Sequence, residues 1–351
     1  MSTEALFAGT GAVRQGFAFD EAALADWMRA NVDGFEGPLV VRQFKGGQSN
    51  PTYHVSTPGR EYVLRRRPPG KIAAGAHAVD REARVMSALG ADGFPVPHIF
   101  GLCMDETVIG TAFYVMEFVR GRVFWSAQFE PVPAQDRPLY FGEMNRLIAD
   151  LHQRSPQQLG LEDFGKKGNY FARQIARWSR QYLTDESAGR DENMDRLIEW
   201  LPRHIPQDDE TCVIHGDFRA DNMVFHPTEP RVLAVLDWEL STLGHPLGDF
   251  VNHLMMYRLP PTILSGLKGV DLVSLNLPTE DAYLAAYCAR TGRERIDNLD
   301  FLFAFTLFRL AAIYHGIRAR ALRGNASSAH ALELASTYAQ IAQLAWEQTG
   351  A

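Results

Sequence analysis

The sequence predicts an α+β fold of two lobes, a small lobe built on an antiparallel sheet and a larger lobe that is mainly helical. Short apolar runs bounded by Gly and Pro dominate residues 35–118, and such runs are typical of strands. Segments with helical spacing dominate after residue 119. We therefore expect an N-terminal tail and helix over 1–34, a small lobe over 35–118 and a large lobe over 119–351. A chain of 351 residues, 46% of them hydrophobic, can bury cores of this size.

The small lobe is expected to contain five strands and one helix, preceded by a helix that Asp20 can cap. An amphipathic segment with Val79, Ala83 and Met86 on one face predicts the helix within the lobe. The strands are expected over 38–41, 52–55, 62–65, 98–103 and 111–118, and the two helices over 20–31 and 77–89.

A Gly-rich polar turn, residues 44–50, separates the first two expected strands. Gly permits a close approach to a ligand, and consecutive backbone N–H groups can form a nest for an anion. Gly46, Gly47, Ser49 and Asn50 are therefore candidate phosphate contacts, although an ordinary hairpin turn accounts for the same residues.

The richest set of polar side chains lies between short apolar runs in residues 213–238. Asp217 and Asn222 fall on a loop between expected strands, and Asp237 ends the returning strand, so a hairpin would bring all three together. A carboxylate five residues before a carboxamide, with a second carboxylate on the neighbouring strand, matches the catalytic loop of kinases. Oxygen ligands of this kind suit Mg²⁺. A polar turn with an Asx cap is the alternative.

These residues resemble the aminoglycoside phosphotransferase family of small-molecule kinases, which has a protein-kinase-like fold. The resemblance rests on His215-Gly216-Asp217 through Asn222 and on Leu236-Asp237-Trp238-Glu239, and it extends over roughly residues 35–320. The continuation from Ser241 to Asp249 is similar to the branch found fused to, or beside, acyl-CoA dehydrogenases.

The resemblance implies transfer of the γ-phosphoryl group of ATP, with Mg²⁺, to a hydroxyl of a small molecule. It implies that Asp217 is the catalytic base, that His215 braces the loop, and that Asn222 and Asp237 are Mg²⁺ ligands. Asp249 is expected to orient the catalytic loop by hydrogen bonds.

Arg65 stands where kinases carry a Lys that contacts the nucleotide phosphates and pairs with a Glu of the next helix. Arg is not a neutral replacement for Lys, but its fork can bind phosphate through two hydrogen bonds. Glu82, close to the apolar stripe of the 77–89 helix, is the expected partner of Arg65. Pairing of Glu82 with Arg81 or Arg84 in solvent is the alternative.

The strand 111–118 ends before Arg120-Gly121, which we interpret as a hinge. The backbone groups of Glu117 and Val119 are then expected to meet the edge of an adenine. A core strand followed by a turn is equally consistent with these residues.

Three other functions compete with a small-molecule kinase. Arg65 suggests a pseudokinase that binds a nucleotide without transfer, and a metal-dependent hydrolase could use His215, Asp217 and Asp237 but would need more ligands at defined spacing. A protein kinase is disfavoured because only eleven residues separate Asp237 from Asp249, and no Ala-Pro-Glu segment follows.

Composition indicates no nucleic-acid and no membrane partner. A net charge of −7 argues against a general nucleic-acid-binding surface. The first fifteen residues lack a basic region followed by an apolar core, so we expect no secretory signal. The most apolar segment, 301–317, is interrupted by Arg309 and His315, which favours a buried helix over a membrane anchor. We expect a cytoplasmic protein with reduced, buried cysteines at positions 103, 212 and 288.

The acceptor is expected to be a hydroxyl compound other than an aminoglycoside, with a hydroxyacyl-CoA as the leading candidate. The branch resemblance and two basic stretches, 65–71 and the 169–183 helix, favour an anionic acceptor, although both stretches are also consistent with solvated surface. The C-terminal helices lack the dense Asp and Glu that a polyamine would favour. The sequence does not indicate the oligomeric state.

Overall fold

The computed structural model describes residues 9–45, 50–70, 77–323 and 336–351. Contacts divide the chain into two compact units. Unit 1 comprises Met1–Trp125, Leu159–Leu161 and Asn222–Ser241, and unit 2 comprises Ser126–Gln158, Glu162–Asp221 and Thr242–Ala351. These units are made of segments that are not contiguous in sequence, so they do not test the lobe boundaries predicted after residues 34 and 118. Those boundaries stay predictions.

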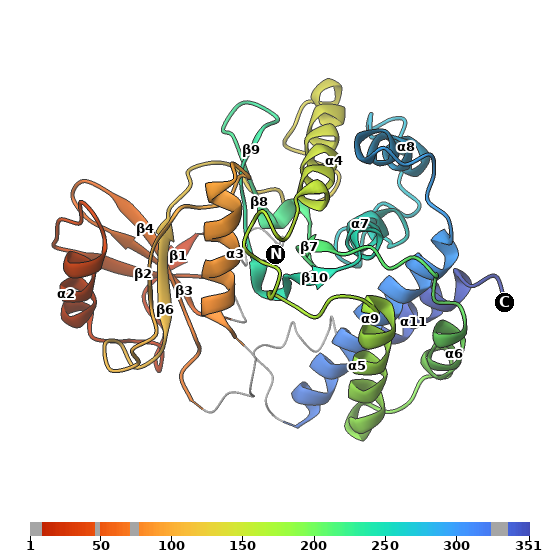
Figure 1. The fold of residues 1–351 in the computed structure, drawn as a ribbon, viewed down its shortest axis with the longest axis horizontal. Coiled ribbons are helices and arrows are strands. Elements are labelled where there is room, and N and C mark those ends of the chain that lie inside the picture. Colours follow the sequence, from red (N-terminus) through yellow and green to blue (C-terminus); the bar gives the residue numbers. More distant parts are fainter. Residues whose placement is uncertain (1–8, 46–49, 71–76, 324–335) are drawn as a thin grey trace. The chain divides into compact units, whose positions relative to one another are not determined.

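Among the described residues of unit 1, six strands form one antiparallel sheet in the order β1-β2-β3-β4-β6-β5 (Figure 1). The five predicted strands are confirmed, and β1 was not predicted. The strands are β1 (Thr10–Gly11), β2 (Val40–Phe44), β3 (Thr52–Ser56), β4 (Glu61–Arg66), β5 (Ile99–Cys103) and β6 (Phe113–Glu117).

The two faces of this sheet are covered by different helices. Side chains alternate between the faces along a strand, so Leu64 of β4 and Val115 of β6 enter the apolar core that also contains Leu24 of α2 (Glu21–Asn31). Arg65 and Tyr114, one residue away in each strand, face the opposite way and contact Glu82 of α3 (Val79–Ala91). The α2 and α3 helices thus cover opposite faces of the sheet, and Arg65 and Tyr114 lie on the α3 side.

A second hairpin in unit 1 pairs β8 (Met223–Phe225) with β9 (Val232–Val235). Phe225 exchanges two backbone hydrogen bonds of 2.8 Å with Arg122. Gly121 makes this approach possible, because a Cβ there would lie 2.2 Å from the Phe225 carbonyl oxygen. The segment after the predicted hinge is therefore tied to the hairpin that carries Asn222 and Asp237.

In its described residues, unit 2 is mainly helical and contains one small sheet. β7 (Cys212–Ile214) pairs antiparallel with β10 (Thr242–Gly244), so the segment before His215 lies beside the segment that follows Ser241. The helices are α4 (Arg137–Gln153), α5 (Tyr170–Thr184), α6 (Glu192–Trp200), α7 (Pro246–Leu254), α8 (Glu280–Thr291), α9 (Leu299–Leu322) and α11 (Tyr338–Glu347). Short 3₁₀ turns lie at Ala134–Asp136, Glu186–Ala188, Leu201–Arg203, Ala220–Asn222, Trp238–Leu240 and Met255–Tyr257.

The core of unit 2 is organised around α9, which packs against α5, α7 and α11 (Figure 1). Within the described residues it is the one helix whose length and composition would allow it to cross a membrane, but 83% of its most apolar window is buried in the protein. The buried helix predicted over 301–317 is therefore confirmed. The three cysteines are also free and buried, as predicted.

Candidate active site

Asn222 and Asp237 lie at the same end of the β8–β9 hairpin. Met223 pairs with Val235, and the Leu236 amide donates to the Asn222 carbonyl at 2.8 Å. Asp237 has φ 63° and ψ 60°, a left-handed conformation that Asp tolerates better than most residues. The predicted juxtaposition of these two residues is confirmed. Asp217 belongs to unit 2, and its expected place beside them stays a prediction.

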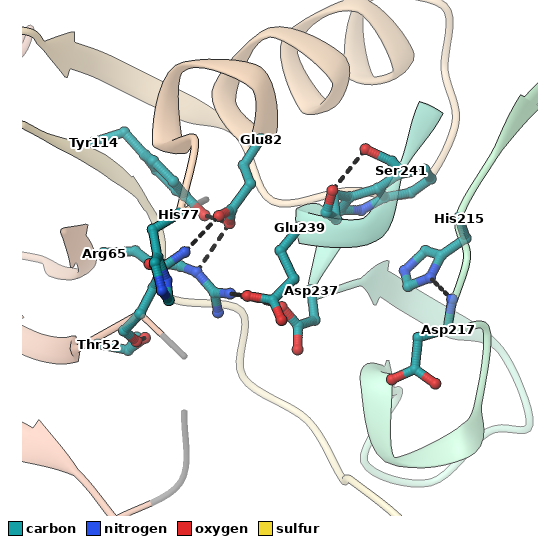
Figure 2. Close-up of polar contacts among 12 residues, drawn as sticks. Thr52, Arg65, His77, Glu82, Tyr114, His215, Asp217, Asp237, Glu239 and Ser241 are labelled. Atoms are coloured by element: carbon teal, nitrogen blue, oxygen red, sulfur yellow. Dashed lines mark hydrogen bonds and ion pairs between the residues drawn. The ribbon is translucent and has the colours of Figure 1, made fainter. Parts of the chain in front are cut away.

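Arg65 is the centre of the polar cluster in unit 1 (Figure 2). Its Nε lies 2.9 Å from Glu82 Oε2, and its Nη2 lies 2.6 Å from Asp237 Oδ1 and 3.2 Å from Glu239 Oε2. The predicted Arg65–Glu82 ion pair is confirmed. The alternative of a solvent-exposed Glu82 is wrong, because that residue is only 1% exposed. Glu239 was not recognised as a partner from the sequence, although it lies two residues after Asp237.

Two further buried groups hold the Glu82 carboxylate. Asn50 Nδ2 donates to Oε1 at 2.7 Å, and the Tyr114 hydroxyl donates to Oε2 at 2.9 Å. Burial raises the pKa of Glu82, an effect that Arg65 opposes. Burial by itself would lower the pKa of the Arg65 guanidinium, but Asp237 and Glu82 raise it above its ordinary value. Arg65 is therefore a permanent cation whose direction is fixed by three carboxylates.

Of the predicted phosphate contacts in the Gly-rich turn, Gly46, Gly47 and Ser49 lie outside the described residues. Asn50 is described, and both ends of its carboxamide are engaged, with Glu82 through Nδ2 and with His77 Nδ1 through Oδ1 at 2.9 Å. Because the side chain is engaged, the predicted phosphate contact of Asn50 would have to use its backbone. That contact stays a prediction.

The predicted adenine contacts also stay predictions. The Glu117 amide donates to the His98 carbonyl at 2.8 Å, so its N–H is already engaged. The predicted contact with an adenine edge therefore depends on two other groups, the carbonyl of Glu117 and the backbone of Val119.

The expectation of a basic surface at residues 65–71 is wrong for the described part of that stretch. Arg65 and Arg66 are buried, and Arg67 donates to the His77 carbonyl and to Asp80. Arg66 points to the face of the sheet opposite Arg65 and lies over the Phe19 ring at 5.3 Å. Alternation along β4 buries both guanidinium groups on different faces, which a run of charges in the sequence does not reveal.

In unit 2 the loop predicted to be catalytic follows β7, and Asp249 of α7 binds its backbone amides. The His215 and Gly216 amides donate to the two Asp249 oxygens at 2.8 and 2.7 Å, and His152 Nε2 lies 3.2 Å from Oδ2. Burial alone would raise the pKa of Asp249, but His152 and His215 hold it below its ordinary value. The predicted hydrogen bonds between Asp249 and this loop are confirmed, and an orienting role in catalysis stays a prediction.

The carbonyl groups of the same loop are held by three residues that the sequence did not single out. Gly216 O accepts from Arg309 Nη2 at 2.8 Å and from Asn252 Nδ2 at 3.3 Å, and Phe218 O accepts from His253 Nδ1 at 2.8 Å. Asn252 and His253 follow Asp249 by three and four residues on one helix, so they share a face with it. That spacing could have identified them.

The expected base Asp217 is half-buried and lies beside a cation. Its amide donates to His215 Nδ1 at 3.1 Å, as drawn in Figure 2, so His215 braces the turn through a nitrogen that carries no hydrogen. Arg219 Nε lies 3.6 Å from Asp217 Oδ1, beyond hydrogen-bond distance, while Arg219 donates through two nitrogens to Asp221. Arg219 therefore adds positive charge without a short hydrogen bond to Asp217.

The oxygen donors at the end of the β8–β9 hairpin fit Mg²⁺. Asn222 supplies an amide oxygen and Asp237 a half-buried carboxylate, and Mg²⁺ needs few protein ligands because it retains waters and binds phosphates. No group of three or more His, Cys, Asp and Glu side chains that could hold a metal ion occurs in the described part of the chain. The fit therefore rests on Asn222 and Asp237.

The model of a family described as the phosphotransferase enzyme family matches residues 40–299. Acyl-CoA dehydrogenase family member 10 of Mus musculus is 40% identical over 341 residues, which cover 96% of this chain and 32% of that protein. Acyl-CoA dehydrogenase family member 11 of Gallus gallus is 41% identical over 350 residues, covering 95% and 44% respectively. The chain thus spans less than half the length of these two relatives.

Solved structures show the same fold. A protein of Ralstonia eutropha JMP134, provisionally named an aminoglycoside phosphotransferase, is 49% identical with a TM-score of 0.87, covering 95% of this chain and 99% of that chain. A spectinomycin phosphotransferase in complex with ADP and spectinomycin has 12% identity and a TM-score of 0.62, covering 95% and 100%. Choline kinase of Cryptosporidium parvum has 14% identity and a TM-score of 0.60, covering 93% and 96%.

At the two lower identities the likeness concerns the fold alone. The kinase-like α+β fold predicted from the sequence is confirmed by these structures. The family match covers most of the chain, including the Arg65 cluster, the β8–β9 hairpin and the loop that Asp249 holds. The chain belongs to the phosphotransferase enzyme family.

Proposed function

We propose that the protein is a small-molecule kinase that transfers the γ-phosphoryl group of ATP to a hydroxyl group. The observation that carries the proposal is Arg65, a buried cation that contacts Glu82 of α3 and Asp237 after β9. A guanidinium is suited to phosphate and a carboxylate to Mg²⁺, and their contact supports the proposed kinase chemistry. Family membership supports the same reaction class.

Each residue has a distinct role in this proposal. Arg65 binds phosphate oxygens and is oriented by Glu82, while Asn222 and Asp237 hold Mg²⁺. The ion, when bound, neutralises charge on the phosphates. Asp217 orients the acceptor hydroxyl and receives its proton. Asp249 keeps the catalytic loop in the geometry that Asp217 needs.

The proposed acceptor is a hydroxyacyl-CoA. Two curated relatives are named as acyl-CoA dehydrogenase family members, and this chain corresponds to less than half of each. The names of these relatives indicate acyl-CoA chemistry in the same polypeptide as the region that this chain matches, which supports an acyl-CoA acceptor. On unit 2, Arg177 and Arg180 of α5 are exposed and give the helix a basic face suited to an anionic acceptor.

A nucleotide-binding protein without transferase activity is a second candidate. It is favoured by the 2.6 Å contact between Arg65 and Asp237, because an arriving metal ion has to displace the guanidinium from that oxygen. Magnesium-dependent turnover of ATP with any acceptor would exclude this candidate.

The proposed function is tested by incubating the protein with labelled ATP or GTP and Mg²⁺ across 3- and 4-hydroxyacyl-CoAs, sugars, amino alcohols and aminoglycosides. We expect label transfer to a hydroxyacyl-CoA, and none with Asp217→Asn under the same conditions. Efficient phosphorylation of aminoglycosides with no activity on the thioesters would contradict the proposed acceptor. Nucleotide binding without transfer to any of these classes would favour the second candidate.

A further inference from the structure

Arg309 of α9 is a buried cation whose hydrogen-bond partners are neutral oxygens. It is only 7% exposed, and its hydrogen bonds go to Gly216 O at 2.8 Å and to Asn252 Oδ1 at 3.4 Å. Among the residues that the structure describes, no carboxylate forms an ion pair with it. A guanidinium buried against neutral oxygens costs free energy that a carboxylate partner would normally offset.

Folding alone does not account for this arginine. Gly216 O also accepts from Asn252 Nδ2 at 3.3 Å, so the carbonyl would keep a donor if Arg309 were neutral. The charge of Arg309 therefore needs an explanation other than satisfaction of one carbonyl group.

A buried anion lies on the other side of the same residue. Asp249, fully buried, accepts from the Gly216 amide at 2.7 Å, while Arg309 donates to the Gly216 carbonyl. The two opposite charges are thus separated by the backbone of one residue. Hydrogen bonds to charged groups are stronger than those between neutral groups, and here they act on two consecutive peptide units.

Gly216 is a position where the chain needs such support. Its φ of 86° lies in the left-handed region, and a glycine there has no side chain to restrict rotation. The next residue is Asp217, so rotation about the Gly216 backbone changes the direction in which the carboxylate leaves the loop. Small displacements of a catalytic group are costly, about 10²-fold in rate for about 1 Å.

We propose that Arg309 is a positioning residue for phosphoryl transfer, which together with Asp249 fixes the peptide units around Gly216 and so sets the direction of Asp217. This inference rests on the proposed role of Asp217 as the base. According to this proposal, α9 contributes to catalysis through Arg309 without contacting the substrate.

The test compares Arg309→Gln, which keeps a donor and loses the charge, with Arg309→Lys, which keeps the charge on a shorter stem. Arg320→Gln is the matched control, because Arg320 is an exposed arginine of the same helix. For each variant we would measure kcat, the KM for ATP, the midpoint of thermal unfolding, and amide hydrogen exchange in the peptide 213–222.

For Arg309→Gln we expect kcat to fall about 10- to 100-fold, with the KM for ATP changed less than about threefold. We also expect exchange at Gly216 and Asp217 to rise about tenfold or more while the thermal midpoint stays within a few degrees. Arg309→Lys should recover part of both losses, and Arg320→Gln should match the wild type. A purely structural arginine would instead lower the thermal midpoint and leave kcat per folded molecule unchanged.

Wild-type kcat and wild-type exchange in Arg309→Gln would overturn the proposal, as would an equal loss in Arg320→Gln. If Arg309→Gln does not fold, Arg309→Lys decides, because a looser contact should lower kcat a few-fold and raise exchange; wild-type values for both would refute it. If the wild-type protein transfers phosphoryl to no acceptor, the proposed function fails, and the exchange data still decide whether Arg309 holds the loop.

Discussion

His253 is expected to make the protein lose stability as the pH falls below neutrality. The ring is buried, with Nδ1 2.8 Å from the Phe218 carbonyl and Nε2 2.6 Å from the Tyr283 hydroxyl. A carbonyl only accepts, so Nδ1 carries the hydrogen and the neutral ring accepts the Tyr283 hydroxyl at Nε2. Burial lowers the pKa of His253 from 6.5 to about 4, although the hydrogen bond to the Phe218 carbonyl and the charge of Asp249 oppose this shift.

The sign and size follow from proton linkage. With a pKa of 6.5 in the unfolded chain and about 4 in the folded one, the unfolded chain binds more protons between these values, so stability falls as the pH falls. The full effect is 6.5 minus 4, or 2.5 units, which at about 1.4 kcal/mol per unit gives about 3 kcal/mol. From about pH 7 to about pH 5 the loss assigned to His253 is about 2 kcal/mol.

The assay is urea denaturation of the wild type and of His253→Asn at both pH values. Asn can keep the donor to the Phe218 carbonyl but has no ring to titrate, so its stability should fall by about 2 kcal/mol less than that of the wild type. His204→Asn, at an exposed position, controls for the loss of an imidazole and should retain the full wild-type decrease. An identical decrease in the wild type and His253→Asn would refute the reasoning.

Four substitutions test the remaining site residues. Glu82→Ala leaves buried partners without their carboxylate and should cost about 3–5 kcal/mol in free energy of unfolding, whereas loss of the exposed Asp26–Arg29 pair in Asp26→Ala should cost at most about 1 kcal/mol; urea denaturation compares them. Arg65→Ala should raise the KM for ATP and lower kcat, with partial activity in Arg65→Lys; full activity in the alanine variant would exclude a phosphate contact. Asp237→Ala should weaken Mg²⁺-dependent nucleotide binding, and a Mg²⁺ titration of bound fluorescent nucleotide that matches the wild type would exclude a metal ligand. Asp217→Asn should lower kcat by about 10²–10⁴ while Mg·ATP binding stays within a few-fold; near-normal turnover would exclude a base.

The features that the sequence predicted are those that short-range geometry determines. The strands of unit 1 follow from alternation and turn residues, and a hairpin of two short strands brings Asn222 to Asp237 because its register is set locally. Glu82 was found because one helix follows β4 and its apolar stripe indicates which side faces inward. In each case the distance along the chain was short enough for the pattern to determine the contact.

Contacts between distant segments could not be predicted in the same way. Arg65 lies 172 residues before Asp237, and its neighbour Arg66 was expected in a solvated turn, yet both are buried. What buries them is a helix or segment from elsewhere in the chain on each face of β4. A run of three arginines has the same composition whether it is covered or exposed, so only the tertiary structure distinguishes the two.

The contacts that hold the loop around Asp217 could be predicted even less well from the sequence. A polar side chain within an apolar helix must find a partner, so Arg309 and His253 alone predict that some acceptor lies nearby. The acceptors are the Gly216 and Phe218 carbonyls, and Asp249 likewise binds two backbone amides. Every residue type presents a carbonyl, and all but proline present an amide, so the partner leaves no trace in the residue types of the loop. Sequence can therefore indicate which side chains of unit 2 need a partner, but the structure is needed to show that so many of them bind the backbone beside Asp217.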